Sequence, residues 1–277
     1  MLLTVWFWHF AVYSFLGWLL ESAFVSIRQR HLVNRGFLNG PFCPIYGFGA
    51  VLILLLRSPL RDSWLLLLLA SILLTTGLEY LTSWLLETLF HTRWWDYSKL
   101  RFNLHGRITL FHSLGWGALG MVLLYVLDPL LSPLLTWTDP KLRLVLACLL
   151  LALLLADLLA TIAGTISLNL QLARLHEMTQ LVRQRNSEFG QDLQARLIFI
   201  VRSFRDWRNQ AKKISAIQRR LLLAFPNFQS HHYPEALHKL RRWLKKQRPQ
   251  LIWPDADIML MRSQLLNQRR KKEGKQS

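Results

Sequence analysis

Five long apolar stretches dominate the first 170 residues, and no other feature restricts the possible folds of this chain as strongly. A helix needs roughly 20 mostly apolar residues to cross a hydrocarbon core about 30 Å thick. Lipid offers the backbone no hydrogen-bond partners, so such segments satisfy their own N–H and C=O groups by forming helices. The stretches cover residues 2–27, 37–56, 64–90, 108–127 and 142–168. We therefore predict an all-α, polytopic membrane bundle with about five transmembrane helices.

The second stretch is the least regular of the five. Glycines and prolines crowd its beginning, at Gly36, Gly40, Pro41, Pro44, Gly47 and Gly49. Glycine and proline interrupt helices, and non-helical backbone at membrane depth must be covered by protein or water. A re-entrant segment and a full crossing both fit this pattern. The apolar run at residues 51–56 favours a full crossing.

Charge divides the chain into two predicted domains. The whole sequence is 52% hydrophobic with a net charge of +18, but residues 1–170 carry only eleven Lys and Arg against eight Asp and Glu. Residues 171–277 carry twenty-three against eight, a net of +15. We expect a transmembrane domain at 1–170 and a basic cytoplasmic tail at 171–277. Because basic residues favour the cytoplasmic side, the N-terminus is predicted outside and the C-terminus inside.

The basic tail shows three helical patterns. Apolar residues recur every three or four positions between 172 and 223, which predicts one long amphipathic helix. Further helices are expected at 235–246 and, after Pro254, at 257–269. In the loop after the third stretch, the aromatic run at residues 94–98 suggests a short helix on the inner membrane face.

Carboxylates inside the apolar stretches are the strongest candidates for function, because a charge at membrane depth is costly. Glu21, Glu79 and Glu87 are expected near the inner surface, and Asp157 near mid-membrane. Glu79 and Glu87 are eight residues apart and point within about 80° of each other on a helix. The predicted site is an inward-facing polar pocket, with Asp157 either part of it or bonded to a neighbouring helix. Its remaining candidate residues are Arg35, Asn39, Asn103, Arg107 and His112. The alternative is a purely structural role, in which these residues form buried ion pairs that fix helix packing.

Several enzyme signatures are missing from the sequence. It has no G-x-x-x-x-G-K-[ST], H-E-x-x-H, C-x-x-C or G-x-S-x-G motif. Without the first of these, the chain supplies no phosphate loop of its own. No catalytic residue, metal or cofactor is therefore predicted.

Five motifs occur in an order that resembles the ABC-transporter type IV, or CmpB-like, family of membrane proteins. They lie at residues 13–21, 35–47, 79–87, 94–98 and 102–108, so the resemblance covers roughly residues 6–120. It implies a multi-pass protein of the bacterial inner (cytoplasmic) membrane, and it points to transport through the family name alone. Four aromatic residues of these motifs, together with Asp96, are added to the candidate site without assigned roles. The five residues are Tyr46, Trp94, Trp95, Asp96 and Tyr97.

Two classes of function compete for this sequence. The first is a permease-like component of a transport system in the lipid bilayer. A separate ATPase subunit and further copies of the chain, in a homo-oligomer, are its candidate partners. The second is a membrane-anchored interaction module whose basic tail binds anionic lipid, nucleic acid or a partner protein. A membrane enzyme acting on a lipid head group is the weaker third alternative.

Overall fold

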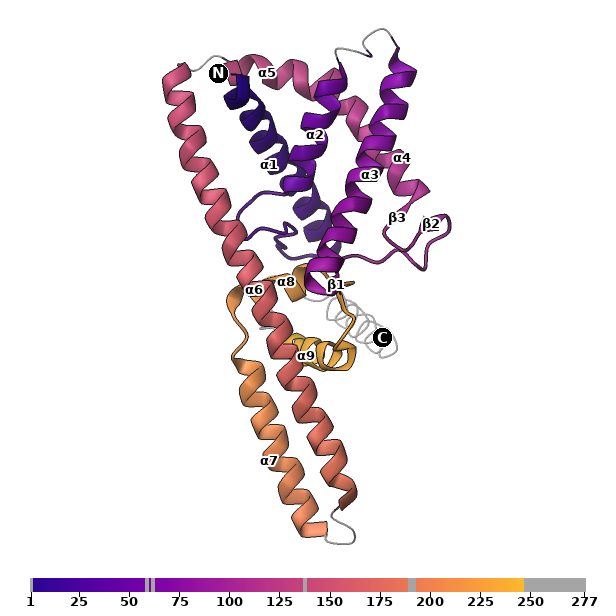
Figure 1. Cartoon of the computed structure of the whole chain (residues 1–277), viewed down its shortest axis with the longest axis vertical. Coiled ribbons are helices and arrows are strands. Elements are labelled where there is room, and N and C mark those ends of the chain that lie inside the picture. Colours follow the sequence, from indigo (N-terminus) through magenta and orange to yellow (C-terminus); the bar gives the residue numbers. More distant parts are fainter. Residues whose placement is uncertain (1, 58–59, 61–62, 137–138, 189–192, 247–277) are drawn as a thin grey trace, which may run out of the picture.

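The computed structural model describes residues 2–57, 60, 63–136, 139–188 and 193–246, and it is mostly helical. Figure 1 shows a helical bundle at one end of the long axis and a helical hairpin at the opposite end. The bundle contains α1 (Leu2–Gln29), α2 (Pro44–Arg57), α3 (Trp64–Phe90), α4 (Leu110–Val122), the π-helical turn η1 (Leu123–Leu127) and α5 (Asp128–Thr136).

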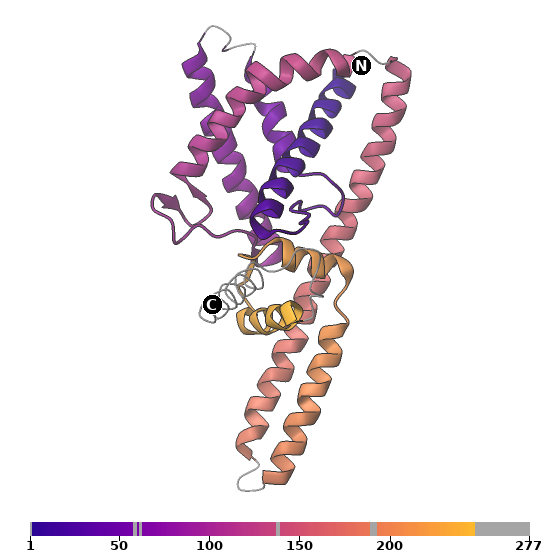
Figure 2. The same ribbon diagram turned by 180° about the vertical axis from the view of Figure 1, so that it is seen from behind.

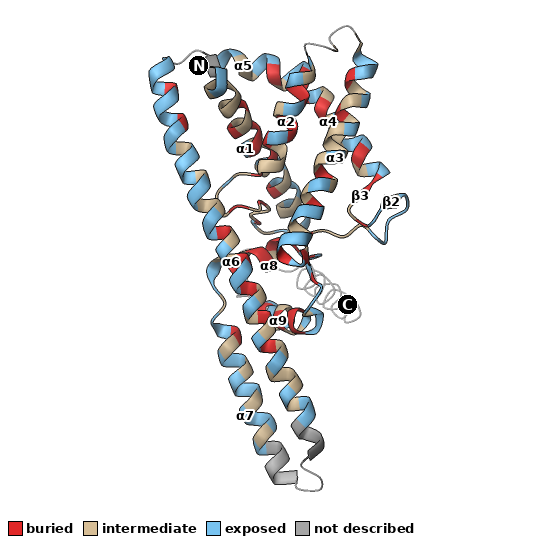
Figure 3. Cartoon of the chain, in the orientation of Figure 1, coloured by how far each residue is buried: buried red, intermediate tan, exposed pale blue. Residues whose placement is uncertain are grey.

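Four helical segments in the described part of the chain are long and apolar enough to cross a membrane. They are Leu2–Gln29, Trp64–Phe90, Leu110–Leu134 and Pro140–Gln184. Much of their apolar surface is exposed, as Figure 3 shows, which suits helices that face lipid. The prediction of a multi-pass helical membrane protein is therefore confirmed.

The second predicted span is wrong in its first half. Helix α2 has only 14 residues and begins at Pro44, while residues 32–43 contain no helix. Gly36, Gly40 and Pro41 explain the difference, because glycine and proline disfavour the helix interior. The count of five crossings stays a prediction, as does the N-out, C-in orientation.

Helices α1 and α2 pack closely through small residues. A Cβ atom added to Gly17 would overlap the Tyr46 ring, and one added to Gly47 would overlap Ser14 and the Phe10 carbonyl. Glycines of this kind allow two membrane helices to approach closely. Their consequence is local: Tyr46 lies directly over α1, where its hydroxyl reaches Glu21.

The loop between α3 and α4 forms strands rather than a helix. Helix α3 ends because His91 adopts a left-handed conformation, with φ of 51°. The predicted surface helix at residues 94–98 is wrong, since these residues lie outside any helix. The loop contains β1 (Thr92–Arg93), β2 (Asn103–Leu104) and β3 (Ile108–Thr109), of which β2 and β3 form an antiparallel hairpin. Strand β1 instead pairs antiparallel with β4 (Gln229–Ser230) of the tail.

The tail begins within a single continuous helix. Helix α6 (Pro140–Glu188) has 49 residues and runs through the predicted domain boundary at 170, so that boundary stays a prediction. Figures 1 and 2 show its far half beside α7 (Leu193–Lys212), with α8 (Ala216–Ala224) and α9 (Pro234–Lys246) beneath the bundle.

The predicted single helix at 172–223 is wrong, because this region contains the end of α6, all of α7 and most of α8. Ser215 caps α8 through a reciprocal pair of hydrogen bonds with Gln218, which starts a new helix. Helix α9 confirms the helix predicted at 235–246. The helix predicted at 257–269 lies outside the described residues.

Two apolar cores stabilise the two halves of the molecule. One lies between α1, α2, α3 and η1 and includes Tyr13, Ile53 and Leu67. The other joins α6, α8 and α9 to the loop after α3, and it contains Trp94 packed edge-on against Phe225 and Phe228. Burial of these large side chains fixes the tail against the end of the bundle.

Candidate functional site

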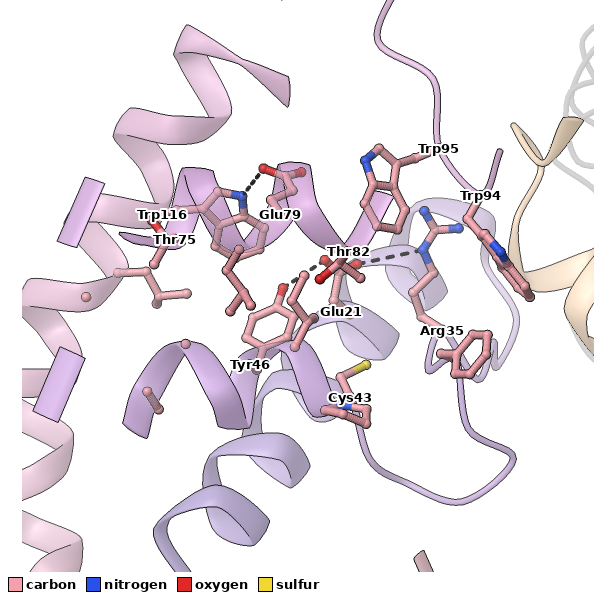
Figure 4. A pocket seen from close by; sticks show the side chains of 18 of the residues that line it. Glu21, Arg35, Cys43, Tyr46, Thr75, Glu79, Thr82, Trp94, Trp95 and Trp116 are labelled. Atoms are coloured by element: carbon pink, nitrogen blue, oxygen red, sulfur yellow. Dashed lines mark hydrogen bonds and ion pairs between the residues drawn. The ribbon is translucent and has the colours of Figure 1, made fainter. Parts of the chain in front are cut away.

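A cavity of about 270 Å³ lies inside the bundle, and its wall is mostly apolar and aromatic. Helices α1 to α4 supply most of the wall, the loops at 35–43 and 94–97 supply more, and Phe225 comes from the tail. Figure 4 shows carboxyl groups, an arginine and aromatic rings converging on this space. The predicted site residues in the wall are Glu21, Arg35, Tyr46, Glu79, Trp94, Trp95 and Tyr97.

Glu79 is the most deeply buried acidic group in the cavity wall. The residue is only 6% exposed, and its Oε2 accepts a 3.0 Å hydrogen bond from the Trp116 indole of α4. The Tyr97 hydroxyl also interacts with this carboxyl group. Burial, followed by the charges of Glu79 and Glu21, raises the pKa of Tyr97 well above its usual value. Tyr97 therefore stays protonated near neutral pH and can donate to Glu79.

Glu21 is held less tightly, from two sides. Its Oε1 accepts a 2.8 Å hydrogen bond from the Tyr46 hydroxyl. Its Oε2 lies 3.7 Å from Arg35 Nε, which is an ion-pair distance but too long for a good hydrogen bond. Arg35 also donates to the Ala224 carbonyl, and its guanidinium lies 4.6 Å from the centre of the Phe225 ring. One arginine thus connects the cavity to the tail.

Glu87 belongs to a separate ion cluster at the end of α3. Its two oxygens contact Arg93 Nη2 and Arg107 Nη2, each at 2.8 Å, and Oε1 also lies 2.8 Å from His231 Nε2. Glu87 and Arg107 are not part of the cavity wall described above. The residues predicted to form one pocket are therefore not all brought together.

Asn39 and Asp157 meet where the loop before α2 contacts α6. Asp157 accepts hydrogen bonds from the backbone N–H groups of Asn39 and Gly40, at 3.1 and 2.7 Å. It also accepts from the Asn39 side chain at 2.9 Å. The carboxylate thus satisfies polar backbone that is not helical, which is the main requirement for such a segment at membrane depth.

Asn103, His112 and Asp96 support the loop that carries the cavity aromatics. Asn103 donates to the Leu100 carbonyl and accepts from the Gly106 N–H. The His112 ring stacks on Tyr97 with 4.4 Å between ring centres. Burial alone would raise the pKa of Asp96, but hydrogen bonds from Ser98 and Gln229 and the charge of Arg93 hold it below its usual value.

Several residues of this region were not predicted from the sequence. Phe225 and Arg220 come from the tail, where Arg220 donates to the carbonyls of Gly36 and Phe37, each at 2.8 Å. Trp116 of α4 is also absent from the predicted site, yet its indole donates to Glu79. The sequence offers only weak signals for these residues: Phe225 precedes Pro226, and Arg220 precedes the apolar run at residues 221–225.

A further polar cluster lies near the start of α5, and its residues are not part of the cavity wall. Asp128 is 4% exposed, pairs with Arg57 and lies 3.5 Å from His9 Nε2. This carboxylate lies one position beyond the predicted end of the fourth apolar stretch, at residue 127, and is not among the predicted site residues. The cluster connects α1, α2 and α5.

Among the described residues, no group of three or more His, Cys, Asp and Glu side chains is arranged to hold a metal ion. The wall of the cavity instead offers carboxyl groups, one guanidinium and aromatic faces. Such a wall suits recognition of an organic ligand better than metal coordination.

Comparison with known proteins identifies a family. No curated protein and no solved structure matches the chain. A family model described as "Putative ABC-transporter type IV" matches residues 8–162, more than half of the chain and all the elements that line the cavity except the tail. This protein therefore belongs to the ABC-transporter type IV, or CmpB-like, family of membrane proteins.

Proposed function

We propose that this protein is the membrane component of a transport system, and that its cavity receives a solute from the cytoplasmic side of the bacterial inner membrane. The separate ATPase that such a system needs would dock on the inner face. The loop between α3 and α4 is the natural surface for that contact, because it is both basic and directly connected to the cavity. Membership of an ABC-transporter family supports this proposal.

One observation carries the proposal: the buried carboxyl of Glu79 faces a cavity instead of a basic partner. Acidic groups inside membrane spans typically mark substrate or ion pathways. Glu87 at the end of the same helix differs, because Arg93 and Arg107 neutralise it. Glu79 receives an indole N–H and has no ion pair within 4.0 Å among the described residues.

The non-helical segment before α2 also supports a transport role. Interrupted helices commonly line binding sites in membrane transporters. Here the interruption supplies Arg35, Phe37 and Cys43 to the cavity wall. A segment that served packing alone would not need to place a charged group beside Glu21.

The tail is integrated with the bundle, which argues against spans that act as a simple anchor. Phe225 lines the cavity, β4 pairs with β1, and Arg220 binds the loop before α2. Binding of anionic lipid, nucleic acid or a partner protein by the tail stays a prediction. The same holds for a homo-oligomer.

The proposal can be tested in cells that lack the chain and are complemented with variants. Glu79→Gln keeps an acceptor for Trp116 but removes the charge. We expect the solute content of these cells, measured by untargeted mass spectrometry, to resemble that of cells without the protein. Glu177→Gln removes an exposed charge from α6 and should resemble wild type. Identical solute profiles in all four strains, with equal protein levels, would refute the proposed function.

A further inference from the structure

The wall of the cavity combines aromatic surfaces with acidic groups. Trp116 and Tyr46 meet edge to face with 5.2 Å between ring centres, and both belong to the lining. Trp95 and Tyr97 bring two more rings from the loop after α3. The faces of aromatic rings attract cations, and cages of such rings recognise quaternary ammonium groups.

The charged groups of the wall also favour a cation. Two carboxyl groups, Glu21 and Glu79, are opposed by one guanidinium, that of Arg35. Arg35 is largely occupied elsewhere, by the Ala224 carbonyl and the Phe225 ring. A positive group inside the cavity would therefore meet an excess of negative charge, and it would favour the ionised form of both carboxyls.

The size and polarity of the cavity limit the rest of the ligand. A volume of about 270 Å³ is near the lower end of small-molecule sites, which run from about 300 to 1,000 Å³. Carbon atoms make up most of the wall, which includes Ile53, Leu78 and Leu119. A fully hydrated inorganic cation would gain little from such a surface, whereas an apolar body would be well accommodated.

We propose that the cavity binds a small organic cation, with an ammonium head beside Glu21 and Glu79 and an apolar body against the aromatic wall. This proposal deepens the proposed function and rests on it only for the use of the cavity in transport. The binding preference itself can be measured on the purified protein.

The protein carries its own reporter for occupancy of the cavity. Cys43 lines the cavity, and the other cysteine, Cys148, is exposed on α6. Cys148→Ala therefore leaves a single thiol, at the site. The probes are benzyltrimethylammonium and phenylmethanesulfonate, which match in shape and number of heavy atoms but carry opposite charges.

The experiment measures the rate at which N-ethylmaleimide labels Cys43 in the full chain, purified in lipid nanodiscs. We expect benzyltrimethylammonium to slow labelling at least about threefold at saturation, while phenylmethanesulfonate leaves the rate unchanged. Equal protection by both probes would overturn the inferred charge preference. Protection by neither would overturn the binding site altogether.

Variants locate the source of the preference. Glu79→Gln and Glu21→Gln should each weaken protection by the cation about tenfold in apparent Kd, as expected for loss of a buried ionic contact. Glu79→Asp keeps the charge and should retain most of the protection, and Glu177→Gln should behave as wild type. Unchanged protection in both glutamine variants would overturn the inference, provided that each elutes as folded protein.

Failure of this inference and failure of the proposed function give different results. If the anion is preferred while Glu79→Gln still alters cellular solutes, transport stands and the ligand class is wrong. If the cation is bound as described but no solute changes in cells, the site stands and the transport role is wrong.

Discussion

Helix α3 carries two glutamates eight residues apart in very different surroundings. Glu87 is enclosed by Arg93, Arg107 and His231, and both of its oxygens have basic partners. Glu79 lies in a cavity wall, where an indole and a phenol are its neighbours. The contrast separates a carboxylate that is paired with bases from one that is not, and only the second is proposed to bind a ligand.

The largest difference should appear when each glutamate is replaced by glutamine. Glu87→Gln leaves two arginines close together with no carboxylate between them, and Glu87 is only 14% exposed. Breaking a buried pair of this kind costs about 3 kcal/mol of unfolding free energy. Glu79→Gln retains its acceptor and should cost less than about 1 kcal/mol. Denaturation of the purified variants in mixed micelles measures both values, and equal losses would contradict the distinction.

Asp157 should rank next, because this carboxylate of the apolar stretches accepts hydrogen bonds from backbone N–H groups instead of pairing with a charged side chain. Asp157→Ala removes the acceptor of two backbone N–H groups and should cost about 2 kcal/mol. Asp157→Asn keeps one oxygen and should cost roughly half as much. Hydrogen exchange at Asn39 and Gly40 should accelerate in the alanine variant. Unchanged protection at these two amides would exclude Asp157 as their partner.

Phe225 allows a test of the contact between the cavity and the tail. Phe225→Leu keeps an apolar side chain but loses the ring that packs on Trp94 and lies beneath Arg35. The expected loss of stability is about 1 kcal/mol. Because Phe225 forms part of the cavity wall, labelling of Cys43 by maleimide should be faster than in a chain with Phe225. Unaltered labelling would mean that the tail does not limit access.

The smallest effect concerns pH and the loop after α3. The pKa of Asp96 is lower in the folded protein than in the unfolded chain, where an aspartate titrates at about 3.9. Its contribution to stability is therefore complete above that value and is lost as the pH falls through the lower folded pKa. Asp96→Asn should flatten the dependence of stability on pH between about 5 and about 3. A slope equal to that of wild type would show that Asp96 contributes nothing.

Hydropathy and the cost of buried charge made much of this molecule predictable. Four spans and helix α9 follow from the spacing of apolar residues, and the family follows from its ordered motifs. Glu21, Arg35 and Glu79 were selected because charge is rare at membrane depth. These signals are local in the sequence, and so they can be interpreted without the fold.

The remaining features depend on contacts between distant segments. The helical angle between Glu79 and Glu87 suggests that both line one cavity. The angle cannot show that Arg93 and Arg107 pair with Glu87 and not with Glu79. Phe225 is almost 200 positions from Arg35, and no pattern in the tail indicates that pairing. The break at Ser215 depends on a capping box that the continuing apolar periodicity obscured.

The length of α6 has a mechanical consequence. At 1.5 Å per residue, its 49 residues form a rod about 70 Å long. Two hydrogen-bonded contacts hold the helix. Asp157 accepts from Gly40 in the loop that lines the cavity, and Ser167 accepts from Gln218 of α8. Because α6 is continuous from Pro140 to Glu188, a tilt of the hairpin that it forms with α7 would move the whole helix. The movement would reach Gly40 through its contact with Asp157.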